Sequence, residues 1–400
     1  MKVSITVVWV TAFLGAAAGI VPEGLAFSGT LDSSVTLAAG AGGAPDFSMG
    51  LEEFLNLRFQ GKLREGAAFY GAVNAAAVSG LAAQTAAALG AGNAAAYPGL
   101  TPSSVTAGEN YAAALELERL YFTLNGEYLD ASAGLMRIPF GYGQVFGPSD
   151  FLNPKNPLVP DARPRAVLGG ALAAYPLDSL KLRLFGAAPK DPLSLEGGGG
   201  LAGLSGDKHW DRASLQALYA FESPKDGSPW GVHRCGLSLK ADLELGFAAD
   251  LLYTYNREDG TGLEGLSFSG GFDYSFPGGR WYVLAEYLYN GSASSTSAGG
   301  GNPVGFSREH FLYTALSRLY SDYTTVTAAC LSAFSDISFV PIMSVEHEVF
   351  QGFTLSLSGK VPLDRDLFSG DGNRGELGPL PPGASRGSRF ILTAKARLRF

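Results

Sequence analysis

Hydrophobic and polar residues alternate through the final stretch of the chain, residues 390–400. Successive side chains of a β-strand point to opposite faces, so this stretch has one face that is apolar to its last residue. The other face carries three cations, Lys395, Arg397 and Arg399. The alternation predicts a strand that ends on an aromatic side chain, Phe400, at the C-terminus.

The same alternation recurs along most of the chain and predicts about seventeen strands of roughly ten residues each. Short turns, such as residues 277–279, alternate with long Gly-, Ala- and Ser-rich loops, such as 80–110, 189–210 and 291–308. The strand candidates cover residues 27–38, 51–60, 67–78, 111–124, 131–139, 164–175, 180–188, 212–221, 232–240, 243–255, 263–276, 281–290, 309–319, 323–334, 338–349, 353–361 and 390–400.

Charged residues fall on the strand face opposite the apolar one. Leucines at 180, 182 and 184 oppose Lys181 and Arg183, and aromatic and apolar residues between 281 and 289 oppose Glu286. In hydrocarbon, every backbone polar group must pair within the protein, and a charge facing lipid at mid-depth costs ~2–4 kcal/mol. The polar faces therefore line an aqueous interior. A soluble β-sandwich, the competing interpretation, would place its polar faces outside.

We therefore predict an all-β fold, a single transmembrane antiparallel β-barrel with short periplasmic turns and long external loops. Such barrels have even strand numbers, so an odd number of candidates implies an error of one. The loops 189–210 and 291–308 belong on the same side, yet an odd number of candidates separates them, which places the error within 211–290. We favour about 16 strands, with about 18 as the alternative.

Composition agrees with a protein whose outer surface faces lipid. Charged residues make up 16% of the chain, against the usual ~25%. Glycine, at 54 of 400 residues, is well above its usual share, and aromatic residues reach 12%. The net charge of −8 argues against a nucleic-acid partner, which would require a basic surface. Cys235 and Cys330 fall in separate strand candidates, and their spacing predicts neither a metal site nor a defined disulfide.

The N-terminus predicts export from the cytoplasm. Lys2 precedes an apolar stretch, and a small-x-small sequence follows at residues 24–26. We interpret residues 1–26 as a cleaved signal peptide and 27–400 as the barrel. The alternative is an uncleaved membrane anchor, but Gly15, Gly19 and Pro22 interrupt the apolar stretch.

Two segments resemble known proteins. The C-terminal strand is similar to that of bacterial outer-membrane β-barrels, in which the final aromatic residue is the assembly signal, here Phe400. Residues 134–157 resemble a recurring segment of porin-like outer-membrane proteins, including alginate-export-type and related uncharacterised porin families. Matching positions are Gly134, Ile138, Gly141, Pro148, Asp150, Asn153 and Pro154. The family's Arg, Gln and Trp positions hold Leu135, Met136 and Phe140 instead, so the resemblance implies a Gram-negative-type porin-like barrel in the outer membrane and no particular substrate.

The resembling segment continues into a loop that glycines and prolines allow to turn sharply. One hypothesis is a constriction loop that folds into the lumen, with Arg137 and Asp150 beside the permeation path. The alternative is a surface loop in which Asp150 and Asn153 cap only local turns. The sequence favours neither.

Lumen-facing charges are the candidate pore-lining residues, because rings of charge set the ion preference of a pore. Both signs occur, so we predict no selectivity, and pairing of opposite charges along the wall is the competing role. The candidates are Arg58, Glu116, Glu118, Arg137, Asp150, Lys181, Arg183, Asp250, Glu286, Lys395, Arg397 and Arg399.

The sequence does not predict catalysis, a metal site or a cofactor. The four histidines are scattered, and no nucleophile-elbow or His-x-x-x-His spacing occurs. We predict a channel for passive or substrate-selective passage of small hydrophilic solutes, with outer-membrane lipid and the barrel-assembly machinery as partners. The alternative is a non-transporting surface protein, an adhesin or antigen that binds through its external loops. A homo-oligomer is an open alternative to a monomer.

Overall fold

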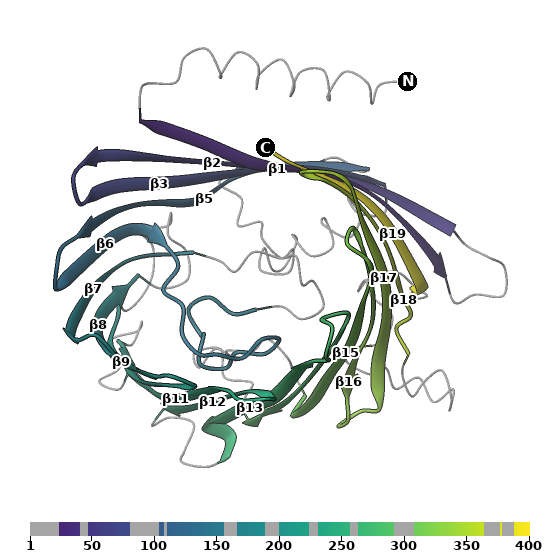
Figure 1. Ribbon diagram of the computed structural model, residues 1–400. Coiled ribbons are helices and arrows are strands. Elements are labelled where there is room, and N and C mark those ends of the chain that lie inside the picture. The colour runs from purple at the N-terminus through teal and green to yellow at the C-terminus, as the bar shows by residue number, and fades with distance from the viewer. Residues whose placement is uncertain are drawn as a thin grey trace.

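The computed structural model describes residues 24–40, 47–80, 104–107, 110–155, 166–188, 200–223, 231–256, 263–291, 308–363, 377 and 388–400. These residues form one closed, antiparallel β-barrel (Figure 1). The first strands are β1 (Leu25–Gly40), β2 (Phe47–Arg64), β3 (Ala67–Gly80), β4 (Ser104–Ala107), β5 (Tyr111–Asn125), β6 (Leu129–Met136), β7 (Val167–Leu177), β8 (Leu180–Ala187) and β9 (Leu201–Trp210).

The second half of the barrel follows the same up-and-down order. Its strands are β10 (Ala213–Glu222), β11 (Val232–Asp242), β12 (Gly246–Asn256), β13 (Leu266–Ser275), β14 (Trp281–Asn290), β15 (His310–Ser321), β16 (Thr324–Ala333), β17 (Ser338–Phe350), β18 (Phe353–Lys360) and β19 (Ser388–Arg399). One turn of 3-10 helix, η2 (Leu263–Gly265), precedes β13. No helix among the described residues has the length and hydropathy needed to cross a bilayer.

Eighteen strands make the wall, and β19 pairs with β1 to close it. The additional strand, β4, is short and pairs with β5 beyond the point where β6 leaves that edge. The alternative strand number from the sequence is thus confirmed, and sixteen is wrong. The missed strand is β9, which lies inside the predicted loop 189–210, so the placement of the error within 211–290 is wrong. Gly206 and Lys208 interrupt its outer, apolar face, so the alternation there is weak.

Short turns and longer connections alternate around the rim. The turns that join β2 to β3, β9 to β10 and β17 to β18 take two residues or fewer, and Leu25 and Phe400 lie at this same end of the barrel. This arrangement agrees with the predicted periplasmic turns and external loops. Because β1 begins at Leu25, the predicted cleavage after Ala26 falls inside this strand, and cleavage stays a prediction.

The two faces of the wall differ as the alternation predicts. Residues paired across strands share a face, and the outer face exposes leucines such as Leu184 and Leu204, 61% and 57% exposed. Near the turn end the outer rings of Phe27, Phe59, Phe69 and Phe122 form a row with centroids 6.3–6.5 Å apart. An apolar exterior with an aromatic row at its edge is typical of a barrel that spans a membrane.

The seam between the first and last strands is closed by backbone and side chains together. Phe400 and Gly29 exchange two backbone hydrogen bonds, at 2.8 and 3.1 Å. A Cβ atom on Gly29 would lie 2.6 Å from the Phe400 ring, so glycine is needed for the ring to cover β1. On the inner face, Nε and Nη2 of the Arg397 guanidinium donate to the two carboxylate oxygens of Asp32, each at 2.8 Å.

Candidate pore constriction

The chain leaves the wall at the end of β6 and enters the barrel interior. Figure 1 shows the connection between β6 and β7 lying inside the ring of strands. The described part of this connection, residues 137–155, is named the inner loop below. It folds into the lumen, as one of the two sequence hypotheses proposes, and it is not a surface loop.

Side chains of the wall hold the backbone of the inner loop. Glu286 on β14 accepts hydrogen bonds from three successive amides, those of Gln144, Val145 and Phe146, each at 2.9 Å. Asp250 on β12 accepts from the next pair along, Tyr142 at 2.8 Å and Gly143 at 3.0 Å.

Gln216 on β10 continues this series and accepts from Gly141 at 2.7 Å. Three alternate strands therefore bind six consecutive amides of the loop. Hydrogen bonds to carboxylate acceptors, five of the six, contribute ~1.5–3 kcal/mol each, so this set fixes the path of the loop.

Two glycines permit the close approach to Asp250. Gly141 has a φ of +78°, a conformation that favours glycine, and a Cβ atom there would lie 2.4 Å from the Asp250 carboxylate. A Cβ atom on Gly143 would overlap the carbonyl oxygen of Phe146. Larger residues at either position would push the loop away from its acceptor.

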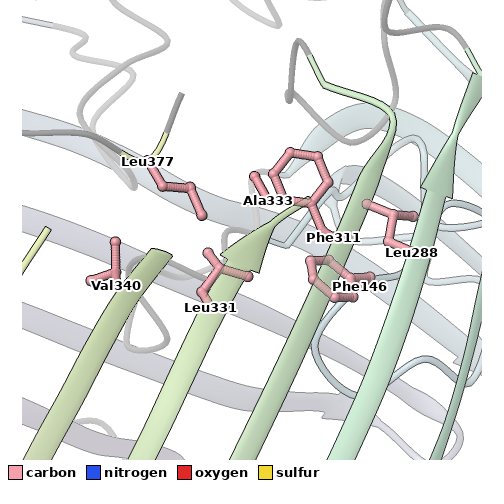
Figure 2. Close-up of a cluster of buried hydrophobic side chains, with 7 residues drawn as sticks. All are labelled: Phe146, Leu288, Phe311, Leu331, Ala333, Val340 and Leu377. Carbon is pink, nitrogen blue, oxygen red and sulfur yellow. The ribbon is translucent and has the colours of Figure 1, made fainter. Parts of the chain in front are cut away.

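Apolar side chains anchor the far part of the inner loop. Phe146 is 1% exposed and packs in a cluster with residues from the inner faces of β14 to β17 (Figure 2). The cluster consists of Phe146, Leu288, Phe311, Leu331, Ala333, Val340 and Leu377. Burying a phenylalanine side chain contributes ~1.5–3 kcal/mol, which adds to the polar contacts of Glu286 next to it.

Stacked rings join the entry and exit of the inner loop. Phe140 and Phe151 stack with centroids 6.0 Å apart and planes 7° apart. Arg183 on β8 lies over the Phe140 ring at 5.7 Å, and Arg234 on β11 lies over the Phe151 ring at 5.1 Å. The Arg183 guanidinium also donates to the Pro139 carbonyl at 3.1 Å.

Asp150 and Asn153 stabilise the loop from within. Asn153 accepts from the Ile138 amide at 2.9 Å, and Asp150 accepts from the Phe140 amide at 3.3 Å. Burial raises the pKa of the Asp150 carboxyl to about 7, although the Phe140 amide and Lys155 act in the opposite direction. Asp150 is 5% exposed, so its position is that of a support inside the loop.

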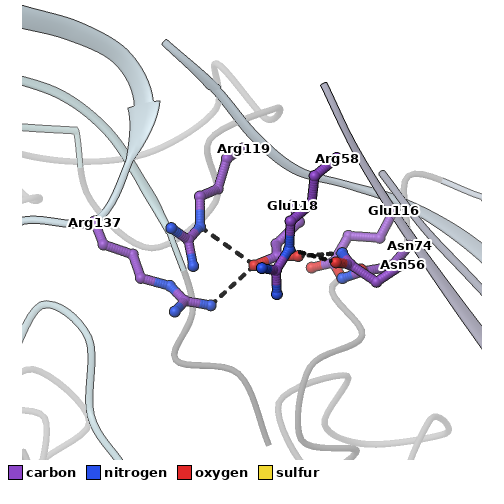
Figure 3. Close-up of polar contacts among 7 residues, drawn as sticks. All are labelled: Asn56, Arg58, Asn74, Glu116, Glu118, Arg119 and Arg137. Atoms are coloured by element: carbon purple, nitrogen blue, oxygen red, sulfur yellow. Dashed lines mark hydrogen bonds and ion pairs between the residues drawn. The ribbon is translucent and has the colours of Figure 1, made fainter. Parts of the chain in front are cut away.

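A polar network covers the inner faces of β2, β3 and β5 (Figure 3). Glu116 accepts from Asn74 at 2.8 Å, Asn74 accepts from Asn56 at 2.6 Å, and Asn56 donates to Glu118 at 2.7 Å. The Asn56 carbonyl accepts from Arg58 at 2.8 Å.

Glu118 joins this network to two further cations. It contacts Arg137 at 3.0 Å and Arg119 at 3.2 Å. The alternation would turn Arg119 outward, but the pairing of β5 with β3 shifts register between Leu117 and Arg119, and this shift places Arg119 opposite the inward Ala72. A bulge has no hydrophobic signature, so the sequence pattern did not indicate Arg119.

The remaining predicted pore-lining residues lie on the inner face, and their pore-lining role stays a prediction. Lys181 lies over the Tyr175 ring at 5.6 Å. Lys395 faces the lumen beside Arg397, and Arg399 is exposed at the turn end of β19. Gln216 and Gln144 complete the constriction. The alternation alone does not distinguish these two residues, although Gln216 falls on the polar face of its strand.

The described ranges contain no second candidate site. Among the described residues, no group of three or more His, Cys, Asp or Glu side chains lies close enough together to form a metal site. Cys235 and Cys330 lie on β11 and β16 and are not disulfide-bonded. His209 contacts Ser214 at 2.9 Å, and the pair lies exposed near a turn.

These features define the class of protein. A closed barrel of eighteen strands with an apolar exterior and a polar interior is the fold of a porin-like outer-membrane β-barrel, and this fold assigns the chain to the outer membrane. No family model matches the sequence, and no curated protein sequence matches it.

Solved structures show which porins share this fold. OccAB3 of Acinetobacter baumannii has a TM-score of 0.53 at 11% identity, over 94% of this chain and 99% of that one. OccK9 (OpdG) of Pseudomonas aeruginosa has a TM-score of 0.54 at 11% identity, over 94% and 98%. OpdQ of Pseudomonas aeruginosa has a TM-score of 0.51 at 10% identity, over 95% and 99%. At these identities the likeness shows the fold alone.

Proposed function

We propose that the protein is an outer-membrane channel for passive or substrate-selective passage of small hydrophilic solutes. The observation that carries this proposal is the inner loop, which wall side chains hold inside the lumen. A loop fixed there by six amide hydrogen bonds narrows the permeation path to a defined size. A barrel that only displayed external loops would not need this construction.

The predicted pore-lining residues then have two different roles. Asp150, Asp250 and Glu286 are 5%, 1% and 2% exposed and support the loop. Arg58, Arg137, Lys181 and Arg183 keep part of their side chains accessible on the inner face and meet the solute. Gln144, at the exposed edge of the loop, contacts Tyr282 and Asp273 on the wall and meets the solute from the other side.

Planar-bilayer recording with purified protein tests the proposal. We expect discrete single-channel currents, and we expect deletion of residues 142–157 to increase the unit conductance several-fold, because the deletion removes the obstruction. A folded wild-type barrel that gives no current would contradict the channel and favour the surface-protein alternative. An unchanged conductance after the deletion would contradict the constriction. Liposome swelling with sugars of increasing size measures the same opening independently.

A further inference from the structure

Arg318 carries a positive charge on the lipid-facing side of the wall. On β15 the side chains of Phe311 and Tyr313 point inward, where they pack in the apolar cluster around the inner loop. Arg318 has the opposite parity along the strand, which it shares with the exposed Leu316, so it lies on the outer face. A charge on this face meets lipid instead of the aqueous lumen.

The position along the strand is that of the lipid headgroups. Arg318 is three residues from Ser321, at which β15 ends and the turn to β16 begins. At ~3.4 Å per residue and a tilt of ~40°, its Cα atom lies ~8 Å from that turn along the barrel axis. The cross-strand neighbour of Arg318 is Trp281, the first residue of β14. Tryptophan is enriched at the boundary between the acyl chains and the headgroups, so Arg318 is within reach of the phosphate layer.

Two aromatic rings hold the Arg318 guanidinium. Its Cζ atom lies 4.8 Å from the centroid of the Trp281 ring and 5.6 Å from that of the Tyr320 ring. These rings order the side chain, but they do not satisfy its five N–H donors. Among the described residues Arg318 has no carboxylate partner, and the acid nearest in the chain, Asp322, lies in the exposed turn after β15. Because arginine keeps its charge in proteins, an anion that pairs with Arg318 comes from outside the wall.

A second cation lies beside this group. Arg280 is exposed in the turn before Trp281, and its carbonyl oxygen accepts a hydrogen bond from the Leu319 amide at 2.8 Å. This bond places the Arg280 backbone on the strand next to Arg318 and one residue further toward the turn. An anion at Arg318 therefore lies in the positive potential of two guanidinium groups.

The outer-face lysine of β9 provides a contrast at the same end of the barrel. Lys208 is two residues from the end of its strand, and its Nζ atom donates to the Ser179 hydroxyl at 2.6 Å. The ammonium of Lys208 is thus already bonded within the wall. The guanidinium of Arg318 is ordered by rings and keeps its donors available, which is the arrangement of a binding group.

We propose that Arg318, supported by Trp281 and Arg280, binds the phosphate of an anionic phospholipid of the phosphatidylglycerol class, in the leaflet at the turn end of the barrel. The planar guanidinium donates to two phosphate oxygens at once, which a lysine cannot do with fixed geometry. The acyl chains then extend along the apolar outer face toward Leu316. A zwitterionic phospholipid carries its own ammonium, which competes with Arg318 for the phosphate, so the anionic lipid binds more tightly.

The test counts the lipids that stay bound to the barrel of residues 27–400 in native mass spectrometry. The barrel is released from nanodiscs that contain equal amounts of phosphatidylglycerol and phosphatidylethanolamine. We expect the wild type to retain phosphatidylglycerol at least five-fold more than phosphatidylethanolamine. Arg318→Gln should lower this retention at least five-fold, and Arg318→Lys should retain an intermediate amount. Lys208→Gln is the matched control and should retain as much as the wild type, with heat-modifiable migration showing that each variant is folded.

Tryptophan quenching tests the same contact with both arginines intact, so it does not depend on the folding of the Arg318 variants. In a Trp210→Phe, Trp230→Phe background, Trp281 is the remaining tryptophan of residues 27–400. Phosphatidylglycerol with brominated acyl chains should quench its fluorescence at least two-fold more than phosphatidylethanolamine with the same chains.

Several outcomes would overturn the proposal. Equal retention or equal quenching by the two phospholipids would show that no anionic lipid is selected. Undiminished retention by Arg318→Gln, or an equal loss in Lys208→Gln, would remove the role of Arg318. Displacement of the lipid by inorganic phosphate would identify an ion site instead, and selective retention of lipopolysaccharide through Arg318 would identify a lipid of the other leaflet.

Discussion

Individual carboxylates decide the shape of this pore by binding backbone rather than by lining open water. Glu286 and Asp250 each accept amide hydrogen bonds from successive residues of the inner loop. Buried amides must find acceptors, and the interior of the loop offers few. The wall therefore supplies these acceptors, and each carboxylate stabilises several amides of the loop at once.

Replacement of Glu286 by alanine should release the tip of the inner loop. Three buried amides would lose their acceptor, at ~1–3 kcal/mol each. We expect at least ten-fold faster hydrogen exchange at residues 144–146 and a noisier, larger single-channel current. The barrel itself should stay folded, as judged by its heat-modifiable migration in electrophoresis. Glu346→Ala, an exposed inner-face residue of β17, is the control, and equal effects of the two changes would contradict the anchoring role.

Asp150 should make the docking of the inner loop dependent on pH. Its pKa is about 7 when the loop is docked and its ordinary value is 3.8, so the docked state binds the proton more strongly. Docking is therefore most stable at acidic pH and loses stability as the pH rises from about 4 through about 7.

Hydrogen exchange measures this effect at the Phe140 amide, which Asp150 binds. After correction for intrinsic rates, protection at pH 5 should exceed protection at pH 8. Asp150→Asn should abolish the difference, because the amide keeps the acceptor and does not titrate. A difference of equal size in the variant would assign the titration to a group other than Asp150.

Among the elements, the terminal strand β19 differs most from its initial interpretation. Its inward cations were expected to act on permeating ions, but Arg397 forms a bidentate pair with Asp32 across the β1–β19 seam. Its final residue completes the ladder with Gly29. Both contacts close the barrel, since an unpaired strand edge in lipid is untenable.

Deletion of Phe400 and the Arg397→Gln change should both impair assembly, the deletion more strongly. The deletion removes two backbone hydrogen bonds and the ring that covers Gly29. The Arg397 change leaves Asp32 without its guanidinium. The fraction of folded barrel in outer-membrane fractions measures both effects. Arg399→Gln, at an exposed position on the same face, should assemble normally, and a comparable loss there would contradict the role of the pair.

At the level of the whole molecule, the described acids that hold the inner loop are buried, whereas Arg58, Arg137, Lys181 and Arg183 stay partly accessible on the inner face. Asp150, Asp250 and Glu286 lie buried against the loop, and Glu118 contacts both Arg119 and Arg137. Charges are screened less where water is excluded, as in a narrow pore. The accessible cations therefore dominate the electrostatic potential along the path of a permeating ion.

The open channel should therefore favour anions over cations, although the sequence count of charges predicts no preference. Reversal potentials across a KCl gradient measure the permeability ratio. The Arg58→Gln, Lys181→Gln double variant should lower the anion preference at least two-fold with little change in stability. Lys240→Gln, whose ammonium pairs with the exposed Asp242, should have no effect. A cation-selective wild type would contradict this assignment of charges.

The alternation of apolar and polar residues was enough to predict the barrel and the inward side of nearly every strand. That pattern is local, because the period of a strand and the cost of charge in lipid act on each segment separately. The alternation did not predict β9, where the pattern is weak, and it did not predict that Arg119 points inward after the bulge beside Glu118.

Only the tertiary structure decided the path of the inner loop and the pairing of its amides. The acceptors Gln216, Asp250 and Glu286 are 75 to 142 residues away from their partners in the chain. No periodicity relates such distant positions. Closure of the barrel brings them together, and so turns a polar strand face into a support for the constriction.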